Sequence, residues 1–187
     1  MQEIELIIKY ARLMKESGIF PGSSGNISVR LRNRIYITPA GISKDELSEK
    51  LLSCIDINGN MINTIKPSSE FKLHIEIYKR RKDINAIIHA HPPFVLICMN
   101  SGMKIDYSLT VEFRKIAGKM AFVEYEKPGS DKLAQKAAIA ASKSNIILLE
   151  RHGIVAVGKN ISEARIIVEN TEYLFMINYF TKLLKNL

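Results

Sequence analysis

The chain has 187 residues, of which 47% are hydrophobic and 25% charged, and a formal net charge of +8. This length predicts one domain over residues 1–187, and the ordinary balance of apolar and charged residues excludes a disordered chain. No apolar stretch approaches the ~18 residues that a membrane span needs, so we expect no membrane partner. The basic charge is spread in short groups without an RNA- or DNA-binding motif, so we expect no nucleic-acid partner either.

Two further features of the sequence bear on the compartment. The two cysteines, Cys54 and Cys98, are too few for a disulfide framework. The N-terminal residues 1–5 lack the basic region of a signal peptide. Both observations predict a cytoplasmic protein.

The N-terminal part of the chain contains a helical pattern followed by two extended ones. Apolar residues at helical spacing over 4–14 predict an amphipathic helix, and a loop of small residues follows over 18–25. Short apolar alternations predict strands at 27–30 and 34–37. Proline and glycine then predict a turn at 38–41.

The next segment contains a capping pattern, a hairpin signal and a longer helix. The serine and glutamate spacing over 43–46 predicts a short helix. Asn58-Gly59 predicts a hairpin between strands at 55–57 and 61–62. A helix is expected to begin near residues 67–70 and to end near Arg81.

The second half of the chain continues the alternation of strands and helices. Its expected elements are a strand at 85–91, a helix at 93–100, a strand at 122–125, a helix at 130–143, strands on both sides of residues 151–153, and a helix from Ser162 almost to the C-terminus. Residues 105–120 fit no pattern. The whole sequence therefore predicts a mixed α/β domain.

Two of the four histidines close the expected strand in the run His89-Ala90-His91. Side chains alternate along a strand, so residues at i and i+2 point to the same face. His152 follows another aliphatic strand. Three neutral imidazoles with an open fourth position suit catalytic zinc. The alternative is that His89 and His91 are ordinary half-buried residues at a strand end.

Polar residues gather at the expected start of the helix that ends near Arg81. Glu70 is a candidate acid/base and fourth metal ligand, although a carboxylate at this place is commonly a surface group stabilised by the helix dipole. Ser68 and Ser69 stand where free N–H groups favour an anion, although simple capping explains one of them. His74 lies one turn after Glu70, and we expect it to pack or to face solvent.

Two strand–loop junctions are further candidates for ligand contact. Gly25-Asn26 and Ala40-Gly41 both contain glycine, which lets backbone approach a ligand closely, and Asn26 adds an amide that offers a donor and an acceptor. The alternative is that both are common turn sequences.

Five short segments together resemble the class II aldolase/adducin family, and most closely its L-fuculose-1-phosphate aldolase members. These segments are Gly25-Asn26-Ile27-Ser28, Thr38-Pro39-Ala40-Gly41, Lys66-Pro67-Ser68-Ser69-Glu70, His89-Ala90-His91-Pro92 and Arg151-His152-Gly153. The resemblance covers nearly the whole chain. It implies a mixed α/β fold whose central, largely antiparallel sheet is flanked by helices, and a homotetramer with sites between subunits.

The resemblance also implies the roles of the site residues. It implies Zn²⁺, or another divalent ion, held by His89, His91 and His152, with Glu70 as the fourth ligand at rest and the catalytic acid/base. The loops that hold the substrate's phosphate match three pairs of residues: Gly25 and Asn26, Ala40 and Gly41, and Ser68 and Ser69. In the fuculose enzymes a tyrosine assists from the neighbouring subunit; an ungapped match puts Thr110 there, with Tyr107 close by.

The activity that the resemblance implies is reversible cleavage of a ketose 1-phosphate to dihydroxyacetone phosphate and a small aldehyde such as lactaldehyde. Other metal enzymes of the family are alternatives. Ribulose-phosphate 4-epimerases carry aspartate where this chain has Glu70, whereas methylthioribulose-phosphate dehydratases carry glutamate. A non-catalytic scaffold like the adducin head is a further alternative, although it has no need of three histidines and Glu70 together.

Overall fold

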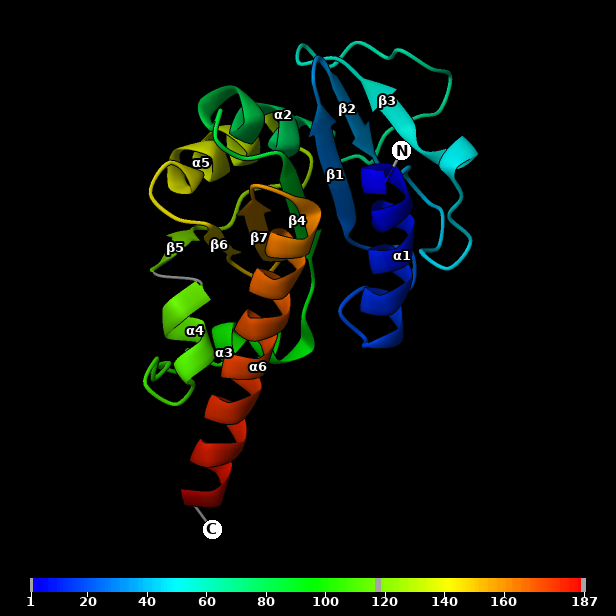
Figure 1. Ribbon diagram of the computed structural model, residues 1–187. Coiled ribbons are helices and arrows are strands. Elements are labelled where there is room, and N and C mark those ends of the chain that lie inside the picture. Colours follow the sequence, from blue (N-terminus) through cyan, green and yellow to red (C-terminus); the bar gives the residue numbers. More distant parts are fainter. Residues whose placement is uncertain (1, 117–118, 186–187) are drawn as a thin grey trace.

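The computed structural model describes residues 2–116 and 119–185. Over these residues, seven strands form one sheet in the order β3-β2-β1-β4-β7-β6-β5 (Figure 1). The strands are β1 (Asn26–Leu31), β2 (Arg34–Ile37), β3 (Ser53–Ile55), β4 (Ala86–Ala90), β5 (Met120–Val123), β6 (Ile146–Leu149) and β7 (Gly153–Gly158). The helices are α1 (Gln2–Glu16), α2 (Phe71–Arg80), α3 (Pro93–Asn100), α4 (Val111–Ile116), α5 (Asp131–Ala141) and α6 (Ile161–Lys185), with the 3₁₀ turn η1 (Glu49–Leu51).

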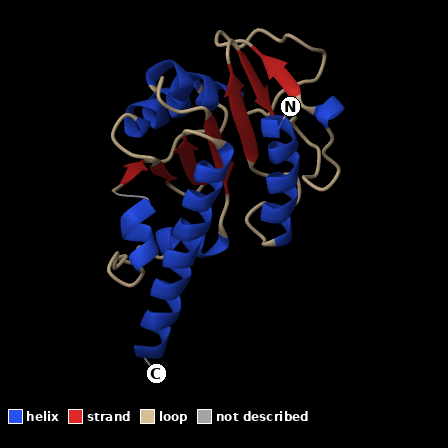
Figure 2. Ribbon diagram, in the orientation of Figure 1, coloured by secondary structure: helices blue, strands red, loops and turns tan. Residues whose placement is uncertain are grey.

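The sheet is largely antiparallel, because β5 and β6 are its parallel pair and the other neighbours run in opposite directions. Helices cover both of its faces, and Figure 2 shows α6 crossing in front of the strands. The mixed α/β fold predicted from the sequence is confirmed. In none of the described helices is there an apolar stretch long enough to cross a membrane.

Strand β4 has every residue buried and divides the core into two layers. Ala86, Ile88 and Ala90 pack with residues of α1, α3 and α6, whereas Ile87 packs with residues of α2 and α5. Because side chains alternate, His89 points to the same face as Ile87. The first metal-ligand candidate therefore lies on the face that α2 covers.

The helix predicted at 43–46 is wrong. Residues 44 and 45 form a turn, and the helical turn in this segment is η1. The reason is a long-range contact: Lys15 on α1 donates to Ser43 Oγ at 2.6 Å and pairs with Asp45 at 2.6 Å. These side chains are therefore engaged with α1, and Ser43 does not cap a helix.

Three other expectations are corrected in detail. The turn at Asn58-Gly59 forms, with Asp56 accepting the N–H groups of Asn58 and Asn60, but its second arm is a single bridge between Ile55 and Met61. The segment without a pattern contains α4. The strand expected at 122–125 lies instead at Met120–Val123, because it pairs with β6 along its full length.

Candidate metal centre and active site

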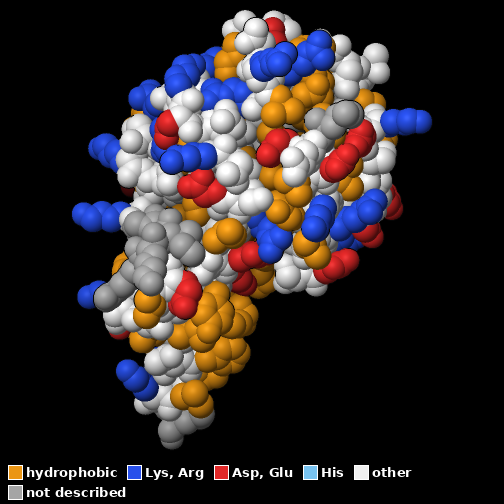
Figure 3. Space-filling model, in the orientation of Figure 1, with side chains coloured by type: hydrophobic (Ala, Val, Ile, Leu, Met, Phe, Trp, Pro, Cys, Tyr) orange, Lys and Arg blue, Asp and Glu red, His pale blue; other side chains and the backbone are white. Residues whose placement is uncertain are grey.

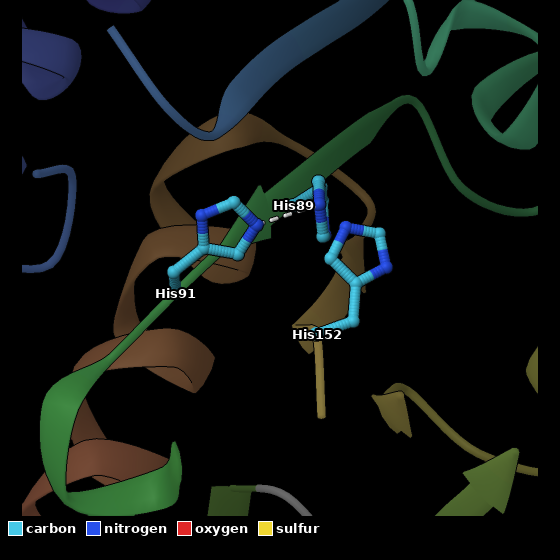
Figure 4. Close-up of side chains that lie close together, drawn as sticks. All are labelled: His89, His91 and His152. Carbon is cyan, nitrogen blue, oxygen red and sulfur yellow. Dashed lines mark hydrogen bonds between the residues drawn. The ribbon is translucent and has the colours of Figure 1, made fainter. Parts of the chain in front are cut away.

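Three histidines come together where β4 and β7 lie side by side. Register pairs Ala90 with Ile154, so the end of β4 meets the turn that carries His152 into β7. His89 belongs to β4, and His91 follows it directly. One ligand atom from each histidine lies within 4.8 Å of the others, and Figure 4 shows the three rings gathered around one point.

The hydrogen bonds of these rings leave nitrogen atoms free for a metal ion. His89 Nδ1 donates to the carbonyl oxygen of Ile154 at 3.0 Å, so its Nε2 carries the lone pair. The Nε2 atom of His91 lies 3.1 Å from that atom. His152 Nδ1 is buried and has no hydrogen-bond partner among the described residues. Three imidazoles whose free nitrogens converge fit zinc or another borderline divalent ion.

The electrostatics of the cluster favour neutral rings. Burial, together with the nearby His91 and His152, holds the pKa of His89 well below its usual value. Burial, followed by the charge of His152 and of Lys44, lowers the pKa of His91 to about 4. Burial also lowers the pKa of His152. At neutral pH all three rings are therefore in the unprotonated form that binds metal.

Glu70 is a buried carboxylate at the N-cap position of α2, where its side chain makes no capping bond. Its residue is 7% exposed, and its Oε2 atom has no hydrogen-bond partner within the described chain. Burial raises the pKa of Glu70, although a hydrogen bond from the backbone N–H of Gly129 opposes the shift. A carboxyl group with a raised pKa suits proton transfer near neutral pH. Its role as fourth metal ligand stays a prediction, because the converging group in the described residues is the three histidines.

Three loops that the sequence singled out lie next to one another. Ser68 N donates to Thr38 O at 3.1 Å, beside a bridge between Pro39 and Pro67. Thr38 Oγ1 accepts from the N–H of Ile27 at 3.1 Å, so the start of β1 joins the same group. The candidate phosphate-binding residues carried by these loops are Gly25, Asn26, Ala40, Gly41, Ser68 and Ser69.

The two serines differ in what they do. Ser68 is buried two residues before the N-cap, and its Oγ accepts from Glu70 N at 3.3 Å, so it bonds the turn that leads into α2 rather than capping the helix. Ser69 is exposed at the same helix start. Ser69 is therefore available to a ligand, whereas Ser68 keeps the N–H of Glu70 bonded within the protein.

Two glycines allow backbone segments to approach the histidines. Gly25 has φ +71°, and a Cβ there would overlap the ring of Phe20 and lie 3.0 Å from His89 O. At Gly153 a Cβ would overlap Ala90 O and lie 2.6 Å from His91 Cδ2. A side chain at Gly153 would therefore displace the strand end that carries the ligands, and one at Gly25 would displace the ring of Phe20.

Two charged residues near the site were missed from the sequence. Lys44 is fully buried and donates from Nζ to Ser23 O at 2.8 Å, and burial lowers its pKa to about 8. Glu172 on α6 accepts from Phe94 N at 2.9 Å and from Val95 N at 3.1 Å, and so holds the start of α3 directly after His91. Local patterns carry no signal for either residue, because their partners are distant in the sequence.

The residues near the expected assisting tyrosine differ in exposure. Thr110 is 5% exposed, and its Oγ1 has no partner among the described residues. Tyr107 is 45% exposed, with its ring 5.9 Å from that of Phe113. Of the two, Tyr107 can reach a neighbouring molecule.

Comparisons with known proteins agree with this geometry. The family model described as class II aldolase and adducin N-terminal domain matches residues 5–179. The chain is 37% identical over 178 residues to an L-fuculose phosphate aldolase of Methanococcus maripaludis, covering 95% of this chain and 97% of that protein. It is 34% identical over 178 residues to a 3-oxo-tetronate 4-phosphate decarboxylase of Haemophilus influenzae, covering 91% of this chain and 82% of that protein. A solved L-fuculose 1-phosphate aldolase superposes with a TM-score of 0.89 at 34% identity, covering 98% of this chain and 87% of that one.

Proposed function

The chain belongs to the class II aldolase and adducin family, and within it we propose an aldolase that reversibly cleaves a ketose 1-phosphate resembling L-fuculose 1-phosphate. The products are dihydroxyacetone phosphate and a small aldehyde such as lactaldehyde. The observation that carries this proposal is the convergence of three neutral histidines, one of which has a buried nitrogen without a partner in the described residues. The names of the aldolase relatives support the substrate class.

The metal that we propose is zinc, held by His89, His91 and His152. Glu70 is the proposed fourth ligand at rest. When bound, the metal supplies a Lewis acid that stabilises negative charge developing on substrate oxygens. The donor set also suits other divalent ions, which metal analysis of the purified protein distinguishes.

Glu70 is the proposed acid/base of the reaction. Cleavage of the carbon–carbon bond turns the adjacent hydroxyl into the aldehyde carbonyl, releases the hydroxyl proton to solvent and leaves an enediolate of dihydroxyacetone phosphate. Glu70, once it has left the metal and taken up a proton from solvent, gives that proton to the enediolate carbon. In the condensation direction Glu70 removes the same proton. Its raised pKa and its unpaired Oε2 support this role, because burial makes the carboxyl hold a proton more readily than an exposed one and an oxygen atom is free to transfer it.

The phosphate group of the substrate is proposed to bind at the three adjacent loops, through Gly25, Asn26, Ala40, Gly41, Ser68 and Ser69. The N-terminus of α2 adds the positive end of the helix dipole. The ammonium of Lys44 is buried against Ser23 O, two residues before Gly25, and adds a positive charge. Both features favour a dianion there.

We further propose a homotetramer with sites between subunits. Large apolar side chains are exposed along α6, with Tyr173 46%, Phe180 46% and Leu184 69% exposed. Figure 3 displays hydrophobic side chains gathered beside the C-terminal half of this helix. A monomer rarely leaves such a surface in water, so an assembly that covers it is favoured. Sedimentation equilibrium tests this, with a mass of four chains expected and a mass of one chain contradicting it.

The compartment and the domain extent are also proposals. Cys54 and Cys98 are free and buried, which supports a reduced, cytoplasmic environment. The single sheet supports one domain over residues 1–187, of which residues 1, 117–118 and 186–187 lie outside the described part.

A second candidate is a decarboxylase that acts on a 3-oxo-tetronate 4-phosphate, because a relative of that name is 34% identical over most of this chain. Both candidate substrates carry a phosphate. The dehydratase and epimerase of the family remain further alternatives, and glutamate at position 70 favours the dehydratase over the epimerase. Intact metal-ligand candidates disfavour a scaffold.

The test is an assay of purified, zinc-loaded protein with L-fuculose 1-phosphate, following release of dihydroxyacetone phosphate with and without a chelator. Chelator-sensitive release is expected. Release of carbon dioxide from 3-oxo-tetronate 4-phosphate, without aldol cleavage, would replace the first proposal with the second.

A further inference from the structure

A chain of buried polar side chains runs from the candidate phosphate site into the core beneath α2. His74 Nε2 lies 2.5 Å from Asn26 Oδ1, and His74 Nδ1 lies 2.6 Å from Ser28 Oγ. Ser28 Oγ in turn lies 2.9 Å from the hydroxyl oxygen of Tyr78. His74, Ser28 and Tyr78 are fully buried, and Asn26 is 3% exposed. Buried polar groups linked in this way hold one another in a single arrangement.

The direction of each hydrogen bond follows from the donors available. Burial lowers the pKa of His74 to about 3, so the ring is neutral and has one donor and one acceptor. Asn26 Oδ1 is an acceptor, so His74 Nε2 carries the proton and donates to it. His74 Nδ1 therefore accepts from the Ser28 hydroxyl, and Ser28 Oγ accepts from Tyr78.

This arrangement determines which end of the Asn26 side chain is free. Its carbonyl oxygen is bound to His74, whereas its amide nitrogen makes no hydrogen bond with the described residues. Asn26 pairs in register with His89, so the free amide lies at the start of β1 next to the metal-ligand strand. This nitrogen is not among the buried side-chain atoms that lack a partner in the described residues, so it is open to solvent and a ligand can reach it.

We propose that His74 is a positioning residue, which holds the Asn26 carboxamide so that its N–H groups face the phosphate of the substrate. Ser28 and Tyr78 hold His74 in the tautomer that this requires. The inference rests on the proposed function, because it takes Asn26 as a phosphate ligand. His74 is not an acid/base itself, since both of its ring nitrogens are already bonded inside the core.

Steady-state kinetics of matched variants test the inference. His74→Phe removes both hydrogen bonds, and we expect the KM for the sugar phosphate to rise about tenfold with a much smaller change in kcat. His74→Gln restores a donor in the place of Nε2 and should recover most of the loss. Ile77→Ala is the control, because Ile77 is fully buried on the same helix and belongs to the apolar cluster. It should lower stability with KM unchanged.

A double-mutant cycle distinguishes positioning from a general effect on the fold. In an Asn26→Ala background, His74→Phe should raise KM no further, since the group it orients is gone. If the two effects on KM multiply, or if Ile77→Ala raises KM as much as His74→Phe, the inference is wrong.

A binding measurement keeps the inference testable when the proposed reaction fails. The side-chain amide resonances of Asn26, assigned by their loss in Asn26→Asp, should shift when inorganic phosphate is added to the zinc-loaded protein. The shift should be much weaker in His74→Phe and largely restored in His74→Gln. An enzyme without aldolase activity that still gives this pattern contradicts the proposed function alone. The inference is wrong if the Asn26 amide resonances do not shift on addition of phosphate, or if they shift as much in His74→Phe as in the wild type.

Discussion

The four histidines lie in two regions that differ in how their nitrogens are used. At the ends of β4 and β6, His89, His91 and His152 face one another, and one of their nitrogens is buried with no partner in the described chain. On the buried side of α2, His74 has both nitrogens bonded, to Ser28 and Asn26. Burial lowers the pKa of all four, so neither burial nor pKa separates the regions. The regions differ instead in their partners: three rings converge on one another and leave one nitrogen unpaired in the described chain, whereas His74 bonds to a serine and an amide.

This difference assigns different roles to the same residue type. Three rings that converge and leave a nitrogen unpaired are suited to a ligand that supplies the missing bond, whereas a single ring bonded to two other side chains holds its neighbours. Substitutions in the two regions should therefore fail in different ways. Substitutions in the converging group should cause loss of the metal. Substitution of His74 should leave the metal bound and disorder the side chain of Asn26.

The largest effect is expected at the converging group. His89→Ala should abolish stoichiometric zinc and lower kcat/KM by more than about a thousandfold, because several kcal/mol of charge stabilisation go with the metal. Metal analysis and the cleavage assay measure both losses. His74→Gln is the matched control and should keep its zinc. If His89→Ala keeps one zinc per chain and the wild-type activity, the converging histidines do not form the metal site.

Glu70→Gln should separate binding from proton transfer within the same site. We expect zinc to stay bound and kcat to fall about 10²–10⁴-fold, because the amide cannot accept the proton. A rate near that of the wild type would assign proton transfer elsewhere, with Tyr107 the next residue to replace.

Acid should destabilise the metal-free protein through the buried rings. The folded-state pKa values of His91, about 4, and His74, about 3, lie below the value of about 6.5 that histidine has when unfolded. Between these values the unfolded chain binds more protons than the folded chain, so stability falls as pH falls from about 6.5 to about 4. Urea unfolding of chelated protein measures this. His74→Gln should show a smaller loss over the same range, and an equal or larger loss would contradict the assignment of His74 to the core.

The smallest effect is expected at Lys44, which supports the phosphate loops without joining either group of histidines. Lys44→Met should raise the KM for the sugar phosphate about threefold to tenfold with little change in kcat, because a nearby positive charge is lost. Wild-type KM should rise as the pH passes about 8, where Lys44 loses its proton, and the variant should lack this rise. An unchanged KM in Lys44→Met would show that the phosphate binds away from this charge.

Much of the sheet could be predicted because its strands are short aliphatic runs between turn residues, as in β2 at Arg34–Ile37. The predicted helix at 43–46 was wrong because Lys15, far away in the sequence, binds its capping serine. The i, i+2 spacing of His89 and His91 predicts a shared face, but their meeting with His152 depends on the pairing of β4 with β7.

The supporting residues of the site could not be predicted for the same physical reason. The contacts of Glu172 with the start of α3 and of His74 with Asn26 join residues that the fold alone brings together. The sequence analysis expected His74 to pack or to face solvent, and packing is confirmed. No pattern in the sequence around His74 indicated its hydrogen bonds.

The central claim is that three imidazole nitrogens form one metal centre. X-ray absorption spectroscopy of the zinc-loaded wild-type protein tests it most directly. We predict three imidazole nitrogens at about 2.0–2.1 Å from zinc, with oxygen completing the shell. A spectrum without imidazole scattering, or with sulfur in the first shell, would contradict the account.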